Sequence, residues 1–280
     1  MLDTMRSLSN YCGEFEKSYT LSRLFSSIIS FKSTFFDFYF MTIDVSFVIV
    51  SYKHDLKLLI DDIQKTVKLS YEIIISNNYG FLSLQDDAVK IINNKHNLGY
   101  GRACNKAIKI SKGKYIIILN PDVTINKNTI PDLIQFMNDN KQVNIAAPKL
   151  LYPDGSLQYS CRRFPTLSTL LLRNTRLVVF KSLRNKVAKD NMLDYNHKEP
   201  RQVDWVSGAF MVLRRKYLFD SNFFMYFEDV DLCRRVGNVW YYPQAFSYHV
   251  GSHGSKKSLK LFCSHIKSMV YYFIKYYFLL

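Results

Sequence analysis

Short apolar runs and helical stretches alternate along this chain from residue 44 onward. Residues 45–50 form an apolar run interrupted only by Ser46, which is typical of a strand buried on both faces of a sheet, and residues 55–69 have the period of a helix. The alternation returns in a helical stretch at 102–110 and in strand-like runs at 72–75, 89–92 and 115–119. This pattern predicts a doubly wound α/β fold, with a mostly parallel central sheet flanked by helices.

Polar side chains follow several of the predicted strands. They are Ser51 and Tyr52 after the first strand, Ser76, Asn77 and Asn78 after the second, and Asn120, Pro121 and Asp122 after the last. Ligands of open α/β sheets bind beyond the carboxyl ends of the strands, so these residues should converge on one edge. Asp122 can hold a divalent cation that bridges a substrate diphosphate, and a simple Asx-Pro turn is the alternative.

The segment FFMYFEDVDLCRR at 223–235 places Glu228, Asp229 and Asp231 within an otherwise aromatic and basic stretch. A carboxylate pair behind a wall of aromatic side chains is suited to general-base chemistry. The apolar wall excludes water, and the second carboxylate tunes the pKa of the first. A solvated acidic turn is the alternative.

Two glycine-containing segments also carry polar side chains. His249 in YHVGSHGS is suited to bind a metal or a phosphate, and a hydrogen-bonded structural histidine is the alternative. The glycines near His253 indicate a loop, which disfavours a two-histidine zinc site. The NLGYG segment at 97–101 resembles a turn before a helix whose N-terminus can hold an anion. It lacks the third glycine of a dinucleotide fingerprint, so it does not support an NAD site.

Composition limits the partners and the compartment. The net charge of +15 indicates anionic partners, which are nucleic acid, an anionic membrane face or phosphate-bearing substrates. The five cysteines lack CxxC spacing, so we expect reduced and mostly buried thiols of a cytosolic protein. No apolar run reaches the roughly 18–20 residues of a spanning helix. The N-terminus lacks a basic region before a clean apolar core, so a signal peptide is not expected.

Both ends of the chain differ from the middle. Residues 1–43 are rich in serine and phenylalanine, and they form either an amphipathic accessory helix or an extension before an ancestral start at Met41. The tail at 256–280 contains five lysines and no acidic residue. Its apolar residues recur at helical spacing, and they are Leu259, Phe262, Cys263, Ile266, Val270, Phe273, Ile274 and Tyr277. A basic amphipathic helix of this kind binds an anionic lipid surface or packs on the domain with its lysines in water. No nucleic-acid motif accompanies it, so nucleic acid is not an expected partner.

Taken in order, segments across 44–255 resemble glycosyltransferase family 2, the inverting enzymes with a GT-A fold. They read VSFVIVSYK at 45–53, NLGYGRACN at 97–105, ILNPDV at 118–123, VDWVSGAFMVLRR at 203–215 and FFMYFEDVDLCRR at 223–235. The stretch CRRFPTLS at 161–168 and the tail are similar to the bacterial rhamnosyltransferase branch, which builds O-antigen and related surface glycans. The resemblance therefore implies a GT-A domain at 44–255.

The family resemblance implies a role for each matching residue. Asp229 would be the catalytic base with Glu228 beside it, and Asp122 with His249 would bind Mg²⁺ or Mn²⁺ on the donor diphosphate. The expected nucleotide-sugar site comprises Ser51, Tyr52, Ser76, Asn77, Asn97, Gly99, Asn105, Asn120 and Asp122. The expected acceptor site comprises Trp205, Gly208, Arg162 and Arg163, where the arginine forks match phosphate oxygens.

The chain departs from the family pattern at two motifs. The second strand usually ends in Asp-Asn, whose aspartate contacts a pyrimidine base, and here it reads Ser76-Asn77, so a serine hydroxyl would contact the base. Asn120 replaces the first aspartate of the DXD motif, which leaves Asp122 as its one anionic ligand. These changes motivate a rival hypothesis, a non-catalytic subunit that binds a nucleotide-sugar or glycan.

The resemblance implies an enzyme at the inner face of the cytoplasmic membrane. It would move a sugar, with dTDP-L-rhamnose as the favoured donor, to a polyprenyl-diphosphate-linked acceptor. Transfer of another hexose from a UDP-sugar is the alternative. The basic tail would bring the enzyme to the anionic lipid surface.

Overall fold

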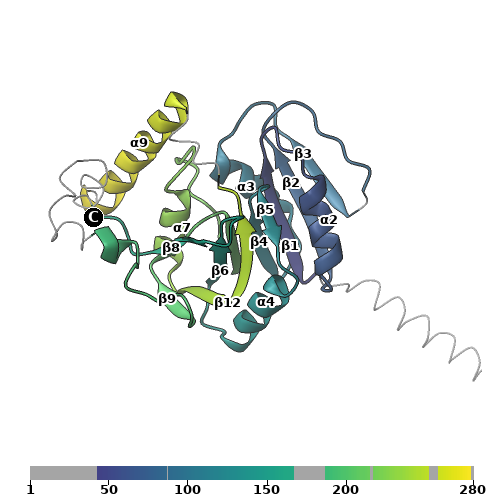
Figure 1. Cartoon of the computed structure of the whole chain (residues 1–280). Coiled ribbons are helices and arrows are strands. Elements are labelled where there is room, and N and C mark those ends of the chain that lie inside the picture. The colour runs from purple at the N-terminus through teal and green to yellow at the C-terminus, as the bar shows by residue number, and fades with distance from the viewer. Residues whose placement is uncertain (1–42, 87, 167–186, 215–216, 252–257, 279–280) are drawn as a thin grey trace, which may run out of the picture. The chain divides into compact units, whose positions relative to one another are not determined.

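A ten-stranded mixed sheet forms the centre of the chain in the computed structural model, which describes residues 43–86, 88–166, 187–214, 217–251 and 258–278 (Figure 1). These residues belong to one compact unit, Ile43–Leu280. The N-terminal stretch whose role the sequence left open lies outside the described residues, apart from residue 43. The predicted boundary after residue 255, between a GT-A domain and a C-terminal helix, stays a prediction.

The main path of the sheet has the strand order β3-β2-β1-β4-β11-β6-β12-β5. In chain order these strands are β1 (Val45–Ser51), β2 (Tyr71–Asn77), β3 (Val89–Asn93), β4 (Tyr115–Leu119), β5 (Val123–Ile125), β6 (Ile145–Leu151), β11 (Phe210–Arg214) and β12 (Val239–His249). The predicted parallel arrangement is confirmed for β3, β2, β1 and β4, which pair in that order. β11 inserts antiparallel between β4 and β6, and β12 continues parallel to β6.

Short strands extend this framework. β7 (Leu157–Gln158) pairs with β6, and β9 (Arg201–Val203) pairs with β12. β8 (Cys161–Arg162) and β10 (Trp205–Val206) form a separate two-stranded sheet. The segment VDWVSGAFMVLRR at 203–215 is therefore divided among three strands, β9, β10 and β11.

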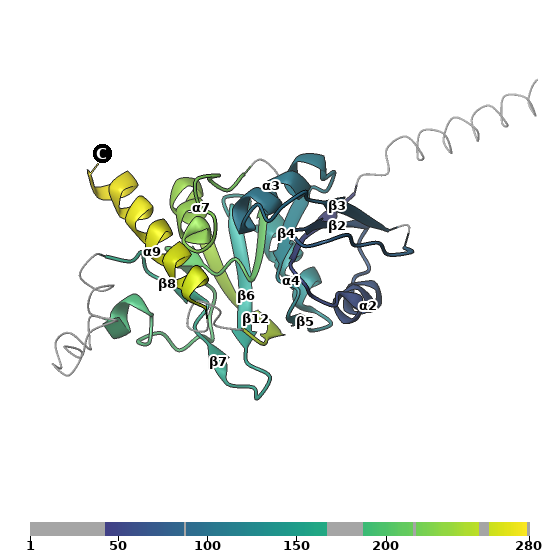
Figure 2. The ribbon, with the colours of Figure 1, turned by 90° about the horizontal axis from the view of Figure 1, so that it is seen from above.

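Helices cover both faces of the sheet, as Figure 2 shows. On one face, α2 (Lys57–Thr66) and α4 (Thr129–Asp139) share a core cluster with Phe47 and Ile49 of β1. On the other face, α3 (Tyr100–Ile110) and α7 (Glu228–Val236) share a second cluster with Val48 of β1. Successive side chains of a strand point to opposite faces, so a strand covered on both sides is apolar throughout. This explains the apolar run at residues 47–50 of β1, and the hydroxyl of the buried Ser46 donates to Glu72 at 2.7 Å.

A C-terminal helix packs beside α7 at the end of the molecule away from β3 (Figures 1 and 2). It comprises α9 (Leu259–Phe273) and a π-helical turn at Ile274–Phe278. Its buried residues Tyr272 and Phe273 join Phe223, Phe227 and Val230 in a third core cluster. The predicted tail helix is thus present, and it packs on the domain. None of the helices in the described residues has the length and apolar character of a membrane span.

The cysteines of the described residues are all free thiols. Cys104, Cys161 and Cys233 are buried, as expected, and burial raises the pKa of each thiol well above its usual value. Cys263 on α9 is exposed. Cys12 lies outside the described residues.

Candidate active site

The backbone takes an unusual path into α7. Tyr226 and Phe227 have φ angles of 70° and 64°, in the left-handed region, immediately before the helix begins at Glu228. Non-glycine residues in that region cost about 1–3 kcal/mol each and cluster at functional sites. The sharp turn places Glu228 and Asp229 in the first turn of α7, where the helix dipole favours negative charge.

Asp229 lies at the centre of the predicted site, half-buried between α7 and β11. Its two carboxylate oxygens accept hydrogen bonds from the backbone N–H groups of Gly208, at 3.0 Å, and Val230, at 2.9 Å. Burial raises the pKa of Asp229 above its usual value, against the opposing effect of these N–H groups and of Arg162. A carboxylate with a raised pKa accepts a proton more readily, which suits the predicted role of general base.

Glu228 is buried more deeply than Asp229. Its side chain is 6% exposed, and its Oε2 atom has no hydrogen-bond partner. Burial and the neighbouring charge of Asp229 raise the pKa of Glu228 to about 8. At neutral pH Glu228 therefore holds a proton, and the pair carries its negative charge on Asp229.

Replacing Glu228 should change how stability depends on pH. A glutamate ionises near pH 4.5 in the unfolded chain, whereas Glu228 keeps its proton to about pH 8 when folded. The folded state therefore binds more protons across this window, and the free energy of unfolding falls as pH rises through it. In Glu228→Gln this part of the slope should vanish, which urea unfolding at pH 5 and pH 8 would measure. An unchanged slope would contradict the protonated state of Glu228.

Asn120 at the end of β4 is tied to the Asp229 region through Tyr100. The Tyr100 hydroxyl lies 3.0 Å from the side-chain oxygen of Asn120 and 2.8 Å from the carbonyl oxygen of Gly208. The Asn120 backbone N–H donates to the carbonyl of Ala209 at 2.9 Å. Sequence reasoning did not select Tyr100 as a site residue. Its place in NLGYG, at the N-terminus of a helix aimed at the sheet edge, was the available signal.

Asp122 and His249, which were predicted to act together, are in contact. The side-chain Nε2 of His249 lies 3.2 Å from Oδ1 of Asp122, because β12 pairs with β5 in a register that aligns His249 with Val123. Burial raises the pKa of Asp122, but the hydrogen bond and charge of His249, together with backbone N–H groups that include that of Gly251, outweigh it, and the net pKa is lowered. Gln158, which sequence reasoning also did not select, holds Nδ1 of His249 at 2.7 Å.

Asp122 and His249 supply only part of the ligand set of a divalent cation. Among the described residues, no three His, Cys, Asp or Glu side chains are grouped as a metal cage. Mg²⁺ commonly uses one or two carboxylates and completes its shell with water and substrate phosphates. One carboxylate and one imidazole at the sheet edge are compatible with that arrangement, in which the donor diphosphate supplies the remaining oxygens. Metal binding stays a prediction.

The residues expected around the nucleotide lie in two different environments. Tyr52 is 45% exposed and makes an edge-to-face contact with Tyr79, with ring centroids 5.4 Å apart. Ser51 at the end of β1 is 2% exposed. Ser76 is fully buried, and its hydroxyl accepts a hydrogen bond from Asn94 at 2.9 Å. The Ser76 hydroxyl, which was expected to contact a nucleotide base, is therefore not exposed in this structure.

The second strand ends two residues later than the sequence pattern indicated. β2 runs to Asn77, so Ser76 and Asn77 are its last two residues and Asn78 follows it. The Asn77 amide donates to the carbonyls of Tyr79 and Gly80 at 2.9 and 3.1 Å, which shapes the loop beneath Tyr79. Asn77, which is 2% exposed, is thus the last residue of the strand, and its amide holds the loop that follows.

Gly99 allows the N-terminus of α3 to lie close to Phe224, in the segment before α7. Its φ is +82°, and a Cβ atom added there would lie 2.1 Å from the carbonyl oxygen of Phe224. Asn97 accepts a hydrogen bond from the Gly99 N–H at 2.9 Å and so shapes this turn. The amide of Asn105 exchanges hydrogen bonds with the backbone of Phe219 at 2.8 and 2.9 Å. In this structure Asn105 therefore holds the chain at Phe219, and its expected contact with the donor stays a prediction.

The residues expected at the acceptor side surround Trp205. The Trp205 indole N–H donates to the carbonyl of Arg163 at 2.9 Å, and the Arg162 guanidinium lies 5.5 Å from the indole ring. Arg162 also lowers the pKa of Asp229. Arg163 instead pairs with Asp194 at 3.5 Å. The two arginines have different partners, so they are not equivalent candidates for a phosphate contact.

Similarity to known proteins shows the family of this chain. The family model described as Glycosyl transferase family 2 matches residues 46–219. The chain belongs to glycosyl transferase family 2. Its sheet and flanking helices are the GT-A fold that the sequence predicted, and it is a glycosyltransferase. The match ends at residue 219, before α7, so it does not include Asp229 or His249. The roles expected for these two residues stay predictions.

Individual relatives are similar at lower identity. Rhamnosyltransferase WbbL of Escherichia coli (strain K12) is 27% identical over 258 residues, covering 81% of this chain and 92% of its own length. An N-acetylglucosaminyl-diphospho-decaprenol L-rhamnosyltransferase of Mycobacterium tuberculosis (strain CDC 1551 / Oshkosh) is 29% identical and covers 60% of each chain. Low-salt glycan biosynthesis hexosyltransferase Agl10 of Haloferax volcanii is 28% identical, covering 69% of this chain and 61% of its own length.

Proposed function

We propose that this glycosyltransferase moves L-rhamnose from dTDP-L-rhamnose to a lipid-diphosphate-linked glycan acceptor, with inversion, in the synthesis of a cell-surface polysaccharide of the O-antigen kind. The names of two relatives, which are rhamnosyltransferases, support the sugar. The name of one of them, which includes a diphospho-decaprenol, supports the acceptor class. The observation that carries the proposal is the half-buried carboxylate of Asp229, which accepts hydrogen bonds from the N–H groups of Gly208 and Val230. Tyr100 links Gly208 to Asn120 at the end of β4.

The reaction requires one proton acceptor and one face for attack. An Asp229 carboxylate oxygen takes the proton of the acceptor hydroxyl while the hydroxyl oxygen of the acceptor forms a bond to the anomeric carbon of the donor. The bond from this carbon to the diphosphate breaks on the opposite face, through an oxocarbenium-like transition state comparable to that of glycosidases. A single displacement of this kind inverts the configuration. Gly208 and Val230 hold the carboxylate in place throughout.

Asp122 and His249 are the residues that would hold Mg²⁺ or Mn²⁺. When bound, the cation supplies positive charge for the diphosphate that leaves. Asn120, held by Tyr100, would line the donor site beside it.

A donor panel tests this function. The purified chain is incubated with dTDP- and UDP-sugars, Mg²⁺ or Mn²⁺, and a polyprenyl-diphosphate-GlcNAc analogue. Release of the nucleoside diphosphate and the mass of the product are measured. We expect a product heavier by one deoxyhexose with dTDP-L-rhamnose. Donor binding without turnover on any acceptor would favour a binding subunit instead.

A UDP-hexose is the second candidate donor. The hexosyltransferase named among the relatives supports this alternative. In the same panel it would give a product heavier by one hexose and release UDP.

We also propose that the enzyme is peripheral on the inner face of the cytoplasmic membrane, where its charge meets anionic lipid. Lys260 and Lys267 are exposed on α9, and each lysine near such a surface contributes about 1 kcal/mol to binding. Lys260→Glu with Lys267→Glu should therefore reduce binding to vesicles that contain phosphatidylglycerol by at least about tenfold. A co-sedimentation assay at low salt measures this, and unchanged binding would refute the electrostatic contribution.

A further inference from the structure

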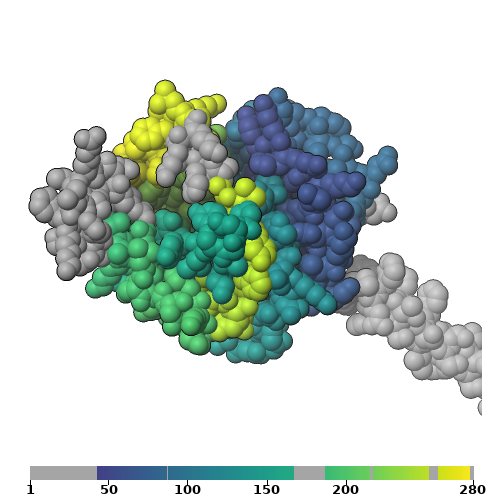
Figure 3. Space-filling view, in the orientation of Figure 1, coloured from purple at the N-terminus to yellow at the C-terminus, as the bar shows by residue number. Residues whose placement is uncertain are grey.

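The C-terminal helix turns most of its apolar stripe away from the protein. Leu259 is 78% exposed, Phe262 and Val270 are each 47% exposed, and Ile274 is 42% exposed. Cys263 and the partly buried Ile266 lie between them along the helix. These six residues, here called the outer stripe, recur at the three- and four-residue spacing that places them on one side. Figure 3 shows α9, in yellow, at the surface of the molecule.

The opposite face of the helix fixes this orientation. Tyr272 is fully buried and its hydroxyl accepts a hydrogen bond from Arg234 of α7 at 2.9 Å. Ser268 donates to the carbonyl of Met225 at 2.8 Å. Lys275 contacts Asp231 at 2.6 Å. The inward face therefore contains hydroxyl and ammonium groups that pair with buried polar partners. Rotating the helix to bury the outer stripe would leave those partners unpaired.

The charge around the outer stripe selects its partner. Lys260 and Lys267 flank the stripe, both are exposed, and residues 259–280 contain no acidic side chain. Two copies of this helix packed face to face would bring lysines together without any carboxylate between them. An anionic lipid surface supplies both an apolar interior for the stripe and negative charge for the lysines.

We propose that the outer stripe inserts into the headgroup and acyl boundary of an anionic membrane, so that α9 lies in the plane of the surface. This goes beyond attraction by charge, because it assigns the contact to named apolar side chains. It rests on the proposed function, since a lipid-linked acceptor would be presented at that surface. The same helix packs against Phe223, Phe227 and Val230 beside Asp229, so insertion would place the active site next to the lipid.

Vesicle flotation of the full chain tests the insertion. The probe is a vesicle of phosphatidylcholine with about one third phosphatidylglycerol, and the variant is Phe262→Gln with Val270→Gln. Removing two large apolar groups from the boundary should weaken binding by at least about tenfold, and the loss should persist at high salt. Phe81→Gln is the matched control, because Phe81 is 86% exposed and lies outside the helix. Its binding should equal that of the parent chain. Equal binding of the double variant and the parent would overturn the proposal.

Cys263 offers a direct reporter of insertion. In a Cys12→Ser background, an environment-sensitive fluorophore on Cys263 should shift to shorter wavelength when the vesicles are added, because the label enters an apolar layer. The same shift on raising protein concentration without vesicles, with dimers in sedimentation, would assign the stripe to a second copy and overturn the proposal.

A water-soluble acceptor separates this inference from the proposed function. With a short-chain acceptor analogue, Phe262→Gln with Val270→Gln should turn over like the parent, because the stripe lies outside the reacting groups. Lost vesicle binding with retained turnover supports insertion. Absent turnover in both chains, with vesicle binding still dependent on the stripe, would reject the proposed reaction and leave the membrane contact intact.

Discussion

Asp229→Asn should lower the turnover number by about 100-fold to 10,000-fold, the usual contribution of a general base. The amide keeps the size of the carboxylate and can still accept a hydrogen bond from Gly208 or Val230. It cannot take the proton of an acceptor hydroxyl. Donor binding, measured by calorimetry, should change little, because Asp229 is expected to contact the acceptor. The assay is the initial rate of nucleoside diphosphate release at saturating donor.

The matched control is Asp139→Asn at the end of α4, on the other face of the sheet. It makes the same chemical change and should retain the parent rate. A turnover number within tenfold of the parent in Asp229→Asn would show that another group is the base. The variant Glu228→Gln would then test the neighbouring carboxyl group.

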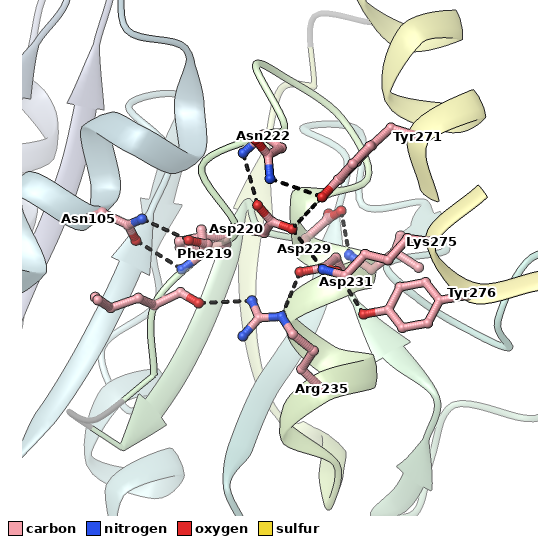
Figure 4. Close-up of polar contacts among 12 residues, drawn as sticks. Asn105, Phe219, Asp220, Asn222, Asp229, Asp231, Arg235, Tyr271, Lys275 and Tyr276 are labelled. Carbon is pink, nitrogen blue, oxygen red and sulfur yellow. Dashed lines mark hydrogen bonds and ion pairs between the residues drawn. The ribbon is translucent and has the colours of Figure 1, made fainter. Parts of the chain in front are cut away.

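Lys275→Met should destabilise the fold strongly, because it removes a partner of a fully buried carboxylate (Figure 4). Asp231 accepts hydrogen bonds from Lys275 at 2.6 Å, Tyr276 at 2.7 Å and Arg235 at 2.8 Å. Lys275 also pairs with Asp220 at 2.7 Å. Burial lowers the pKa of Lys275, but its bonds to both carboxylates outweigh this and raise it well above the usual value.

Breaking one side of a buried ion pair costs about 3–5 kcal/mol, because a charge is left uncompensated. Arg235 still pairs with Asp231 in Lys275→Met, so we expect a loss near the low end, about 3 kcal/mol, in urea unfolding. Lys267→Met, on the exposed side of the same helix, should change stability by less than about 0.5 kcal/mol. Adding Asp231→Asn should recover part of the loss. An unaffected Lys275→Met would mean that the C-terminal turn does not hold α7.

Much of the fold followed from local periodicity. The apolar run of β1 predicted a strand covered on both faces, and the alternation along the chain predicted a mostly parallel sheet, whose parallel part β3, β2, β1 and β4 form. The polar residues after these strands then had to share an edge, because parallel strands end on the same side. The boundary of β2 was less certain, since Ser76 is polar yet fully buried by pairing with Asn94.

Identifying the candidate site required both the sequence motifs and the contacts between distant segments. Sequence spacing and family resemblance selected Asp229, Asp122 and His249, and the order of the motifs supported the family. Only the tertiary structure brings His249 to Asp122, through the pairing of β12 with β5, and only it reveals Tyr100 between Asn120 and Gly208. Hydrogen bonds between distant segments leave no periodic signature, so a sequence pattern does not indicate them.

The C-terminal helix shows the same division. The residues at 256–280 were enough to predict a helix with one apolar side and several lysines, because side-chain spacing fixes which residues share a face. The tertiary structure decided which face meets the protein. Asp231 and Asp220 require a cation and hydroxyl groups, so the tyrosines and Lys275 turn inward and the apolar stripe turns outward. A buried charge must be paired, and this requirement outweighs the burial of a few apolar side chains.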